Sequence, residues 1–300
     1  MIPPASDVPA VMDVTREFQV SLERELGGRS STNWLVSGKN DALVLRRYLD
    51  VLELGPTMQR EAIDWQAQTR ARLHRAGWPV AAPIEEPLRS GGAWWTLEEW
   101  LPGTSAQMSP TQHAHLFARW GNLVDLAEEL GPQPHRLDHL NVLVDDDAAQ
   151  SFAECADEQD RGWLLRRLDQ VRAGAQDVDW DASPRTLVHG DLAGHNLLWS
   201  GGRLTGVLDL ELATVDRRIT EAMLVWRCRH DDVLLAYDKV AKLNDQEWRM
   251  VLIDWWALML SLCLFHLRRG RQPGRWELDA LRRTSPLSEK LSRDLFNVRP

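Results

Sequence analysis

The residues with the clearest chemical potential lie in one short segment. His189-Gly190-Asp191 is followed by Asn196, five residues after the aspartate, and by Asp209 a further 13 residues on. An aspartate and an asparagine on one loop can supply a proton acceptor and a metal ligand, and a second carboxylate can supply the main ligand of a hard cation such as Mg²⁺. Phosphoryl transfer to a hydroxyl needs these parts, together with an acceptor held in line. The pattern therefore indicates phosphoryl-transfer chemistry.

Each of these residues also has a purely structural interpretation. His189-Gly190-Asp191 can form a simple turn, Asn196 can cap a turn, and Asp209 can end a strand. The joint order is more specific than any single member, because the polar residues alternate with short β-like runs. These runs are Leu187-Val188, Asn196–Trp199 and Gly206–Leu210. Order and spacing together favour the catalytic interpretation.

The order His-Gly-Asp-x-x-x-x-Asn, followed by apolar-apolar-Asp, resembles the catalytic and metal-binding segments of the aminoglycoside phosphotransferase and choline kinase superfamily. That superfamily is similar in fold to eukaryotic protein kinases, and the resemblance extends more weakly over nearly the whole chain. It implies that Asp191 is the catalytic base or the carboxylate that orients the hydroxyl, with His189 bracing the same loop. It also implies that Asn196 and Asp209 bind Mg²⁺, that ATP or GTP is the donor, and that the acceptor is a small hydroxylated molecule.

Two upstream charges fit the same resemblance. Arg46 lies in Leu43–Arg47, which resembles the strand that carries the phosphate-binding cation, where the family often has Lys. Arg can hold a phosphate bidentately, although its geometry differs from that of Lys. Glu61, in the next predicted helix, is the expected ion-pair partner of Arg46. A surface arginine at a strand end and a solvated glutamate remain the alternatives.

Two segments are candidates for contacts with the nucleotide. Gly27–Asn33 stands where a phosphate-covering loop is expected but lacks G-x-G-x-x-G, so its backbone N–H groups and hydroxyls would make the contacts. These hydroxyls belong to Ser30, Ser31 and Thr32. An ordinary polar turn is the alternative. Glu98–Leu101 is the expected hinge, in which the backbone of Glu99 and Leu101 would bind the adenine edge.

Departures from the protein-kinase pattern point to a small acceptor. Asp209-Leu210-Glu211 replaces Asp-Phe-Gly, and no proline occurs between Pro184 and Pro273, so the usual activation segment is absent. Glu221 stands about a dozen residues after Asp209, where the family usually has a further aspartate. We expect Glu221 to brace the catalytic loop.

The acceptor itself stays open at this level. The segment 145–160 holds seven acids and no Lys or Arg, so it could attract a polyamine sugar or a quaternary amine, or simply be a solvated loop. A cationic aminoglycoside-like antibiotic is slightly favoured, which would imply antibiotic resistance, over choline, homoserine, a sugar or a ketosamine. A degenerate kinase-like module that binds nucleotide without chemistry is the alternative from another class.

Composition excludes other classes of function. The chain has 300 residues and a net charge of −9, which argues against nucleic acid as a partner. Three scattered cysteines offer no metal site and fit a reducing compartment, and the N-terminus lacks the pattern of a signal peptide. The apolar run Met250–Leu267 is short for a membrane span and predicts a buried core helix. We expect a cytoplasmic protein with no membrane partner.

The elements that must position these residues form an α+β, protein-kinase-like fold. We expect an N-terminal nucleotide-binding lobe over residues 1–101, with an antiparallel sheet and a helix, and a mostly helical catalytic and substrate-binding lobe over residues 102–300. The predicted strands are 34–36, 42–45, 79–88 and 94–100. The predicted helices are 11–26, 56–76, 112–130 and 161–173, with helices only from Ile219 onward.

Overall fold

The computed structural model describes residues 8–27, 31–39, 41–49, 54–135, 138–226 and 231–296. The chain forms two compact units that interleave along the sequence. Unit 1 comprises Met1–Gln107, Leu130–His135 and Ala193–Ala213. Unit 2 comprises Met108–Glu129, Arg136–Leu192 and Thr214–Pro300. The prediction of one boundary at Leu101 therefore differs from this division, because the hairpin after the catalytic loop pairs with strands of unit 1.

Unit 1 is built on an antiparallel sheet of five strands in the order β1-β2-β3-β5-β4. The strands are β1 Ser21–Gly27, β2 Ser31–Ser37, β3 Ala42–Tyr48, β4 Leu88–Ser90 and β5 Ala93–Glu99. The predicted β2–β3 hairpin is confirmed, with a register that runs without interruption from Ser31–Tyr48 to Ser37–Ala42. Because side chains alternate across a strand, this register decides which residues share a face.

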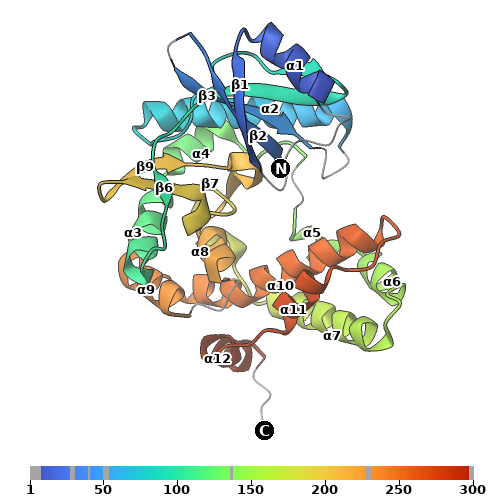
Figure 1. Cartoon of the computed structure of the whole chain (residues 1–300). Helices are drawn as coiled ribbons and strands as arrows, with labels where there is room; N and C mark the ends of the chain where they lie inside the picture. The colour runs from blue at the N-terminus through green and yellow to red at the C-terminus, as the bar shows by residue number, and fades with distance from the viewer. Residues whose placement is uncertain are drawn as a thin grey trace. The chain divides into compact units, whose positions relative to one another are not determined.

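One face of the sheet carries the apolar core of unit 1. Helix α1 (Val8–Glu17) packs Val11 and Val14 against this face, and Figure 1 shows the helix lying beside the strands. Trp34 and Trp95 stack there with ring centroids 5.5 Å apart and are both almost fully buried. Alternating apolar residues in the strands thus direct one complete face toward α1.

The opposite face of the sheet is covered by helix α2 (Gly55–Arg75), which was predicted as a helix over 56–76. This face is polar in part. The Tyr48 hydroxyl donates to Gln66 Oε1 at 3.4 Å, and Arg70 of the helix reaches a carboxylate of β5. Buried polar groups need such partners. The α2 face is therefore the side of the sheet on which charges are arranged.

The predicted bounds of three elements are wrong, two of them in unit 1 and one in unit 2. The helix predicted over 11–26 ends at Glu17, and the chain turns through Gln19, whose φ is 54°, before β1 pairs with β2. The strand predicted over 79–88 is mostly irregular, with single bridges at Val80 and Pro83. The helix predicted over 112–130 is interrupted near Gly121.

A second, three-stranded sheet of unit 1 holds the segment after the catalytic loop. Its order is β6-β8-β9, with β6 Thr104–Ser105, β8 Leu197–Ser200 and β9 Arg203–Val207. The Val207 N–H donates to the Pro79 carbonyl at 2.7 Å, which ties β9 to the strand region before β4. These hydrogen bonds place residues 193–213 in unit 1.

Unit 2 is mainly helical, as predicted. Its helices are α3 Pro110–Trp120, α4 Val124–Leu130 (all but its last residue), α5 Asn141–Val144, α6 Ala148–Ala153, α7 Glu158–Ala175, α8 Arg218–Trp226, α9 Asp231–Ala241, α10 Asp245–Leu267, α11 Arg275–Arg282 and α12 Pro286–Leu295. Its one strand pair among the described residues joins β7 (Arg185–Val188) to β10 (Thr214–Arg217), with antiparallel register. Beyond Arg218, every regular element that the structure describes is a helix, which confirms the prediction for this region.

Helix α10 forms the centre of unit 2. It is buried on all sides over most of its length, which explains why its sequence shows little amphipathic pattern. Among the described residues it is the one helix whose length and composition would also suit a membrane span, and 78% of its most apolar window is buried inside the protein. The prediction of a buried core helix at Met250–Leu267 is confirmed.

A buried ion pair joins α8 to the start of α10. The Arg218 guanidinium donates to both carboxylate oxygens of Glu247 at 2.7 Å, and Ser183 donates to the same carboxylate at 2.9 Å. Glu247 is fully buried. Burial alone would raise the pKa of Glu247, but the hydrogen bonds from Arg218, the Asn244 N–H and Ser183, together with the charge of Arg218, outweigh it and the pKa is lowered. The carboxylate is therefore charged in the folded state.

We predict that Glu247→Gln lowers the free energy of unfolding by about 3 kcal/mol at pH 7, because it leaves Arg218 without its charged partner. A carboxyl with a lowered folded-state pKa stabilises the protein above its unfolded pKa of about 4.3 and loses that effect as pH falls. The difference between the two proteins should therefore shrink below about pH 4. Urea unfolding of both proteins at pH 7 and below about pH 4 measures this difference. Glu128→Gln, on the exposed side of α4, is the control, and equal stabilities at pH 7 would contradict the prediction.

Candidate active site

The catalytic loop begins where β7 ends. Gly190 has φ of 83°, a left-handed conformation that favours glycine, and it turns the chain between His189 and Asp191. The His189 ring is fully buried and lies edge-on to Trp120, with centroids 5.6 Å apart. The Asp191 N–H donates to His189 Nδ1 at 3.2 Å. The His189 ring therefore contacts the backbone of Asp191, and its bracing role stays a prediction.

Glu221 of α8 binds the backbone of the same loop. Its carboxylate accepts the backbone N–H groups of His189 at 2.5 Å, Gly190 at 3.1 Å and Leu192 at 3.2 Å. Glu221 is almost fully buried. Hydrogen bonds to an ionised acceptor are about twice as strong as neutral ones. The prediction that Glu221 braces the catalytic loop is confirmed, and the clamp fixes the backbone on both sides of Asp191.

Asn196 and Asp209 are brought together in unit 1. The Leu208 N–H donates to the Asn196 carbonyl at 2.9 Å, so the end of the hairpin lies against the turn Gly194–Asn196. Asp209 has φ of 60° and ψ of 63°, a left-handed conformation that is uncommon for residues other than glycine. Such backbone strain persists where surrounding structure enforces it and is frequent at functional sites.

The donor set around Asp209 suits a hard cation. Its Oδ1 is buried and has no hydrogen-bond partner among the described residues, so a strong acceptor is left for another ligand. Asn196 is 6% exposed and supplies an amide oxygen from the adjoining turn. Carboxylate and amide oxygens are the ligands of Mg²⁺ rather than of softer metals. No group of three or more His, Cys, Asp or Glu side chains that could hold a metal occurs in the described part of the chain.

Arg46 lies at the centre of a buried charge network on the α2 face of the sheet. Its Nη1 donates to Glu211 Oε1 at 2.9 Å and lies 3.8 Å from Asp209 Oδ1. Its Nε lies 3.8 Å from Glu98 Oε1, which is also bound by Arg70 Nη1 at 2.8 Å. The side chain of Arg46 is only 10% exposed. Two arginines and three carboxylates thus meet around one strand position.

The network keeps Arg46 and Glu98 ionised. Burial alone would lower the pKa of Arg46, but the surrounding negative groups, Glu98 first, raise it above its ordinary value. Burial would likewise raise the pKa of Glu98, but Arg70 and Arg46 lower it. Each charge compensates the desolvation of another, as buried charges require. Arg46 is therefore a permanent cation held beside Asp209.

The expected ion pair between Arg46 and Glu61 is wrong. Glu61 is half-exposed on α2, and its Oε2 pairs with His135 Nε2 instead. The physical reason is helix geometry, because Arg70, not Glu61, lies on the stripe of α2 that faces Glu98. The helix contributes a cation to the network, and strand β5 contributes the carboxylate.

The predicted phosphate-covering segment, Gly27–Asn33, is described only at Gly27 and from Ser31 onward, and its described hydroxyls lie on different faces of β2. Ser31 pairs with Tyr48 across the hairpin and Asn33 pairs with Arg46, so both share the face of Arg46. Thr32 pairs with Arg47 and lies on the opposite face. Ser30 falls outside the described residues. Ser31 thus remains a candidate for nucleotide contact, whereas the placement of Thr32 argues against that role.

Part of the predicted hinge segment already forms hydrogen bonds within unit 1. The Glu99 N–H donates to the Ala82 carbonyl at 3.1 Å, and the Glu99 carboxylate accepts the Ala82 N–H at 3.2 Å. The backbone donor of Glu99 is therefore already used. Leu101 lies beyond the end of β5, and its role in adenine binding stays a prediction.

Several functional candidates were missed by the sequence reasoning. Glu98, Arg70 and Glu211 form the charge network, and Asn33 has a buried Oδ1 without a hydrogen-bond partner among the described residues. Glu98 offered one signal, since a glutamate in an otherwise apolar strand is rarely buried without a partner. Nothing in the sequence indicated which cation would meet it.

Removal of the clamp on the catalytic loop has a direct readout. We predict that Glu221→Gln speeds amide hydrogen exchange at His189, Gly190 and Leu192 by about tenfold or more, because a hydrogen bond to a carboxylate contributes about 1.5–3 kcal/mol. Glutamine keeps one acceptor oxygen and places an N–H₂ group against N–H donors. Exchange measured by NMR, with Glu154→Gln as an exposed control, checks this. Unchanged protection at all three amides would contradict it.

Comparisons with known proteins identify the family and the fold. A family model described as the phosphotransferase enzyme family matches residues 22–255. No curated protein matches the chain in sequence. Among solved structures, aminoglycoside phosphotransferase APH(4)-Ia is similar at 16% identity and a TM-score of 0.62, covering 95% of this chain and 98% of that chain.

Two further structures are similar. The GDP complex of aminoglycoside 2'-phosphotransferase-IIIa has 16% identity and a TM-score of 0.66, covering 97% of this chain and 99% of that chain. An aminoglycoside phosphotransferase of Alicyclobacillus acidocaldarius has 17% identity and a TM-score of 0.56, covering 93% and 92%. At these identities the likeness shows the fold, and it confirms the predicted kinase-like α+β class. Because the family model spans most of the sequence, the chain belongs to the phosphotransferase enzyme family and is an enzyme that transfers a phosphoryl group to a hydroxyl of a small molecule.

Proposed function

We propose that this phosphotransferase uses a nucleoside triphosphate, ATP or GTP, and transfers its γ-phosphoryl group to a small hydroxylated acceptor. The observation that carries the proposal is the clamp of Glu221 on the backbone around Asp191. A catalytic carboxylate must be held within a fraction of an ångström of its productive position. Support also comes from solved relatives, since APH(4)-Ia has been crystallised with ADP and hygromycin B, and with AMP-PNP and hygromycin B.

In the proposed reaction, Asp191 orients the acceptor hydroxyl and takes its proton. The hydroxyl oxygen forms a bond to the γ-phosphorus, the bond from that phosphorus to the β,γ-bridging oxygen breaks, and the nucleoside diphosphate leaves with the electron pair. His189 and Glu221 keep the Asp191 backbone in place. Neither residue exchanges a proton in the proposed reaction.

Asn196 and Asp209 would hold Mg²⁺, which supplies charge neutralisation for the phosphate oxygens when it is bound. The Oδ1 of Asp209, which is buried and accepts no hydrogen bond from the described residues, and the strained backbone of Asp209 support this assignment. Arg46 would contact the phosphates from the β3 side, with Glu98 and Glu211 fixing its guanidinium. The arginine can do so bidentately, which suits a site where the family often has lysine.

The case for a cationic acceptor is weakened by the structure. In the acidic segment, Asp145 pairs with Arg268 and Asp160 pairs with Arg282. Asp157 caps helix α7 by accepting the Asp160 N–H at 2.8 Å. Two of the seven acids are therefore used in ion pairs within the fold, which reduces the charge that the segment offers to a cation. Choline, homoserine, sugar and ketosamine acceptors stand beside the aminoglycoside class on equal terms.

We predict that Asp191→Ala lowers the rate of phosphoryl transfer by about 10³-fold while nucleotide affinity stays within about threefold, because the residue acts on the acceptor proton. Coupled release of ADP or GDP with Mg²⁺, on a panel of aminoglycosides, choline, hydroxy amino acids, sugars and ketosamines, measures the rate. Asp146→Ala, an exposed aspartate, is the control. Retained turnover in the Asp191 variant would overturn the proposed base.

Two adjacent arginines allow a matched test of the phosphate site. Arg46 lies on the α2 face, whereas Arg47 stacks over Trp95 on the other face at 5.8 Å. We predict that Arg46→Met weakens nucleotide binding by about 10- to 100-fold, since a charge-assisted hydrogen bond contributes about 1.5–3 kcal/mol. Arg46→Lys should recover part of the affinity, and Arg47→Met should leave it unchanged. Calorimetric titration with the non-hydrolysable AMP-PNP or its guanosine analogue checks this, and equal losses in both Met variants would contradict it.

A further inference from the structure

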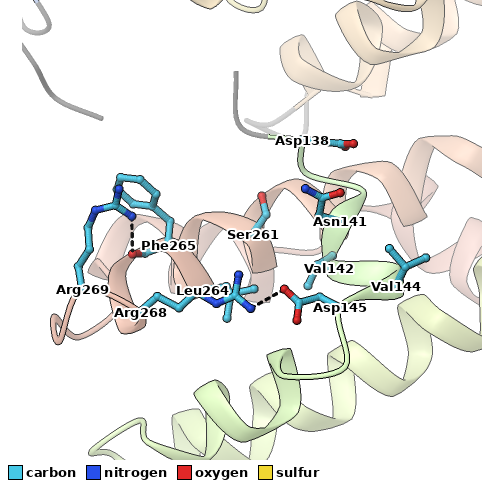
Figure 2. Close-up of a pocket in the computed structure, with 10 residues that line it drawn as sticks. All are labelled: Asp138, Asn141, Val142, Val144, Asp145, Ser261, Leu264, Phe265, Arg268 and Arg269. Atoms are coloured by element: carbon cyan, nitrogen blue, oxygen red, sulfur yellow. Dashed lines mark hydrogen bonds and ion pairs between the residues drawn. The ribbon is translucent and has the colours of Figure 1, made fainter. Parts of the chain in front are cut away.

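Unit 2 contains a cavity of about 370 Å³ between the segment 138–145 and the C-terminal half of α10. Figure 2 shows that polar and apolar side chains from both segments line it. Its size lies within the usual range for small-molecule pockets, about 300–1,000 Å³, near the lower limit. A cavity of this volume can hold a compact metabolite but is small for a sugar of several rings.

The cavity carries positive charge on one side. Arg268 Nη2 pairs with Asp145 Oδ2 at 2.5 Å, and its side chain is 45% exposed. A guanidinium has five N–H donors, so this pair leaves others for a ligand. Next to it, the Arg269 guanidinium lies 3.6 Å from the centroid of the Phe265 ring and donates to the Phe265 carbonyl at 3.4 Å. These contacts hold two cations, which directly follow the C-terminal end of α10, at one edge of the cavity.

The other side of the cavity carries oxygen acceptors. Asp138, Asn141 and Ser261 line it there and are labelled in Figure 2. The Asp138 carboxylate accepts the Leu140 N–H at 2.9 Å through one oxygen, and the residue is exposed. This side is suited to an ammonium or hydroxyl group, and the opposite side to a carboxylate. The charged side chains that line the cavity balance, with two acids and two arginines.

The wall of the cavity is tied to the catalytic loop through buried hydrogen bonds. His139, next to Asp138, binds Asp254 Oδ1 of α10 at 2.6 Å. Thr220 donates to Asp254 Oδ2 at 3.1 Å, and Thr220 precedes Glu221, which clamps the backbone around Asp191. His139, Asp254 and Thr220 are almost fully buried. Asp254 therefore connects His139, which follows Asp138 in the chain, to Thr220, which precedes the residue that clamps the backbone around Asp191.

We propose that this cavity binds the phosphoryl acceptor and selects a small hydroxylated zwitterion, with one ammonium and one carboxylate group, over a polycation. The inference rests on the proposed function. Asp138 would receive the ammonium, Arg268 would receive the carboxylate, and the apolar wall of Val142 and Leu264 would cover the carbon chain. A polycation would bring its second positive charge against Arg268, which disfavours it by like-charge repulsion.

Binding is tested apart from turnover in the Asp191→Ala protein. Calorimetry with L-serine, L-homoserine and 5-hydroxynorvaline is compared with choline, 3-hydroxybutyrate and hygromycin B, all with AMP-PNP and Mg²⁺ present. At least one hydroxy amino acid should bind tenfold or more tightly than choline, which lacks the carboxylate, and than 3-hydroxybutyrate, which lacks the ammonium. Tighter binding of choline or hygromycin B, or no binding of any hydroxy amino acid, overturns the proposal.

Variants in the protein with Asp191 intact assign the binding to this cavity. Arg268→Gln should raise KM for the best hydroxy amino acid at least tenfold with kcat within threefold, and Asp138→Asn should do the same. Arg275→Gln is the matched control. The side chain of Arg275 is 94% exposed and pairs only with Asp279 among the described residues. An unchanged KM in both cavity variants overturns the placement.

The outcomes separate this inference from the proposed function. Transfer to a sugar or an aminoglycoside that is insensitive to Arg268→Gln and Asp138→Asn would overturn the cavity while the phosphotransferase mechanism stands. Binding of a hydroxy amino acid that depends on both residues, with no transfer in the wild-type protein, would overturn the mechanism while the cavity stands. Transfer to a hydroxy amino acid that both variants impair supports the two together.

Discussion

The carboxylate of Glu221 is the point on which the catalytic segment depends. A loop of polar residues after a buried strand would leave several backbone N–H groups without partners, and one ionised acceptor satisfies three of them at once. The cost of burying that charge is offset by the donors that surround it. Helix α8 thereby becomes the support of the loop, and α10 supports α8 through Asp254 and Thr220.

The same principle governs unit 1, where charge rather than apolar packing organises one face of a sheet. Arg46, Arg70 and Glu98 are each almost fully buried, and none would be stable there alone. Together they keep a cation beside Asp209. The helix was expected to supply the carboxylate of the ion pair. In the structure α2 supplies an arginine, Arg70, and β5 supplies the carboxylate, Glu98. It also accounts for an arginine at the β3 position, because a planar guanidinium can meet several carboxylates at once.

Charge pairing also decides how the acidic segment should be understood. A run of aspartates and glutamates in the sequence suggests an attractive surface for cations, yet Asp145 and Asp160 each pair with an arginine that is more than 100 residues away in the chain. What remains near α10 is a cavity whose charges balance. Such a cavity discriminates by the arrangement of both signs within a ligand, and less by its net charge.

Local features of this protein follow from its sequence alone. The order and spacing of His189, Asp191, Asn196 and Asp209 indicate the chemistry, short-range periodicity predicts the β2–β3 hairpin and α2, and the family resemblance places Glu221 at the catalytic loop. Which charges meet depends on the three-dimensional fold. Glu98 and Arg70 are 28 residues apart and Arg46 and Glu211 are 165 apart. Such pairings depend on strand register and on which stripe of a helix faces the sheet, and periodicity within one segment does not encode the identity of the partner.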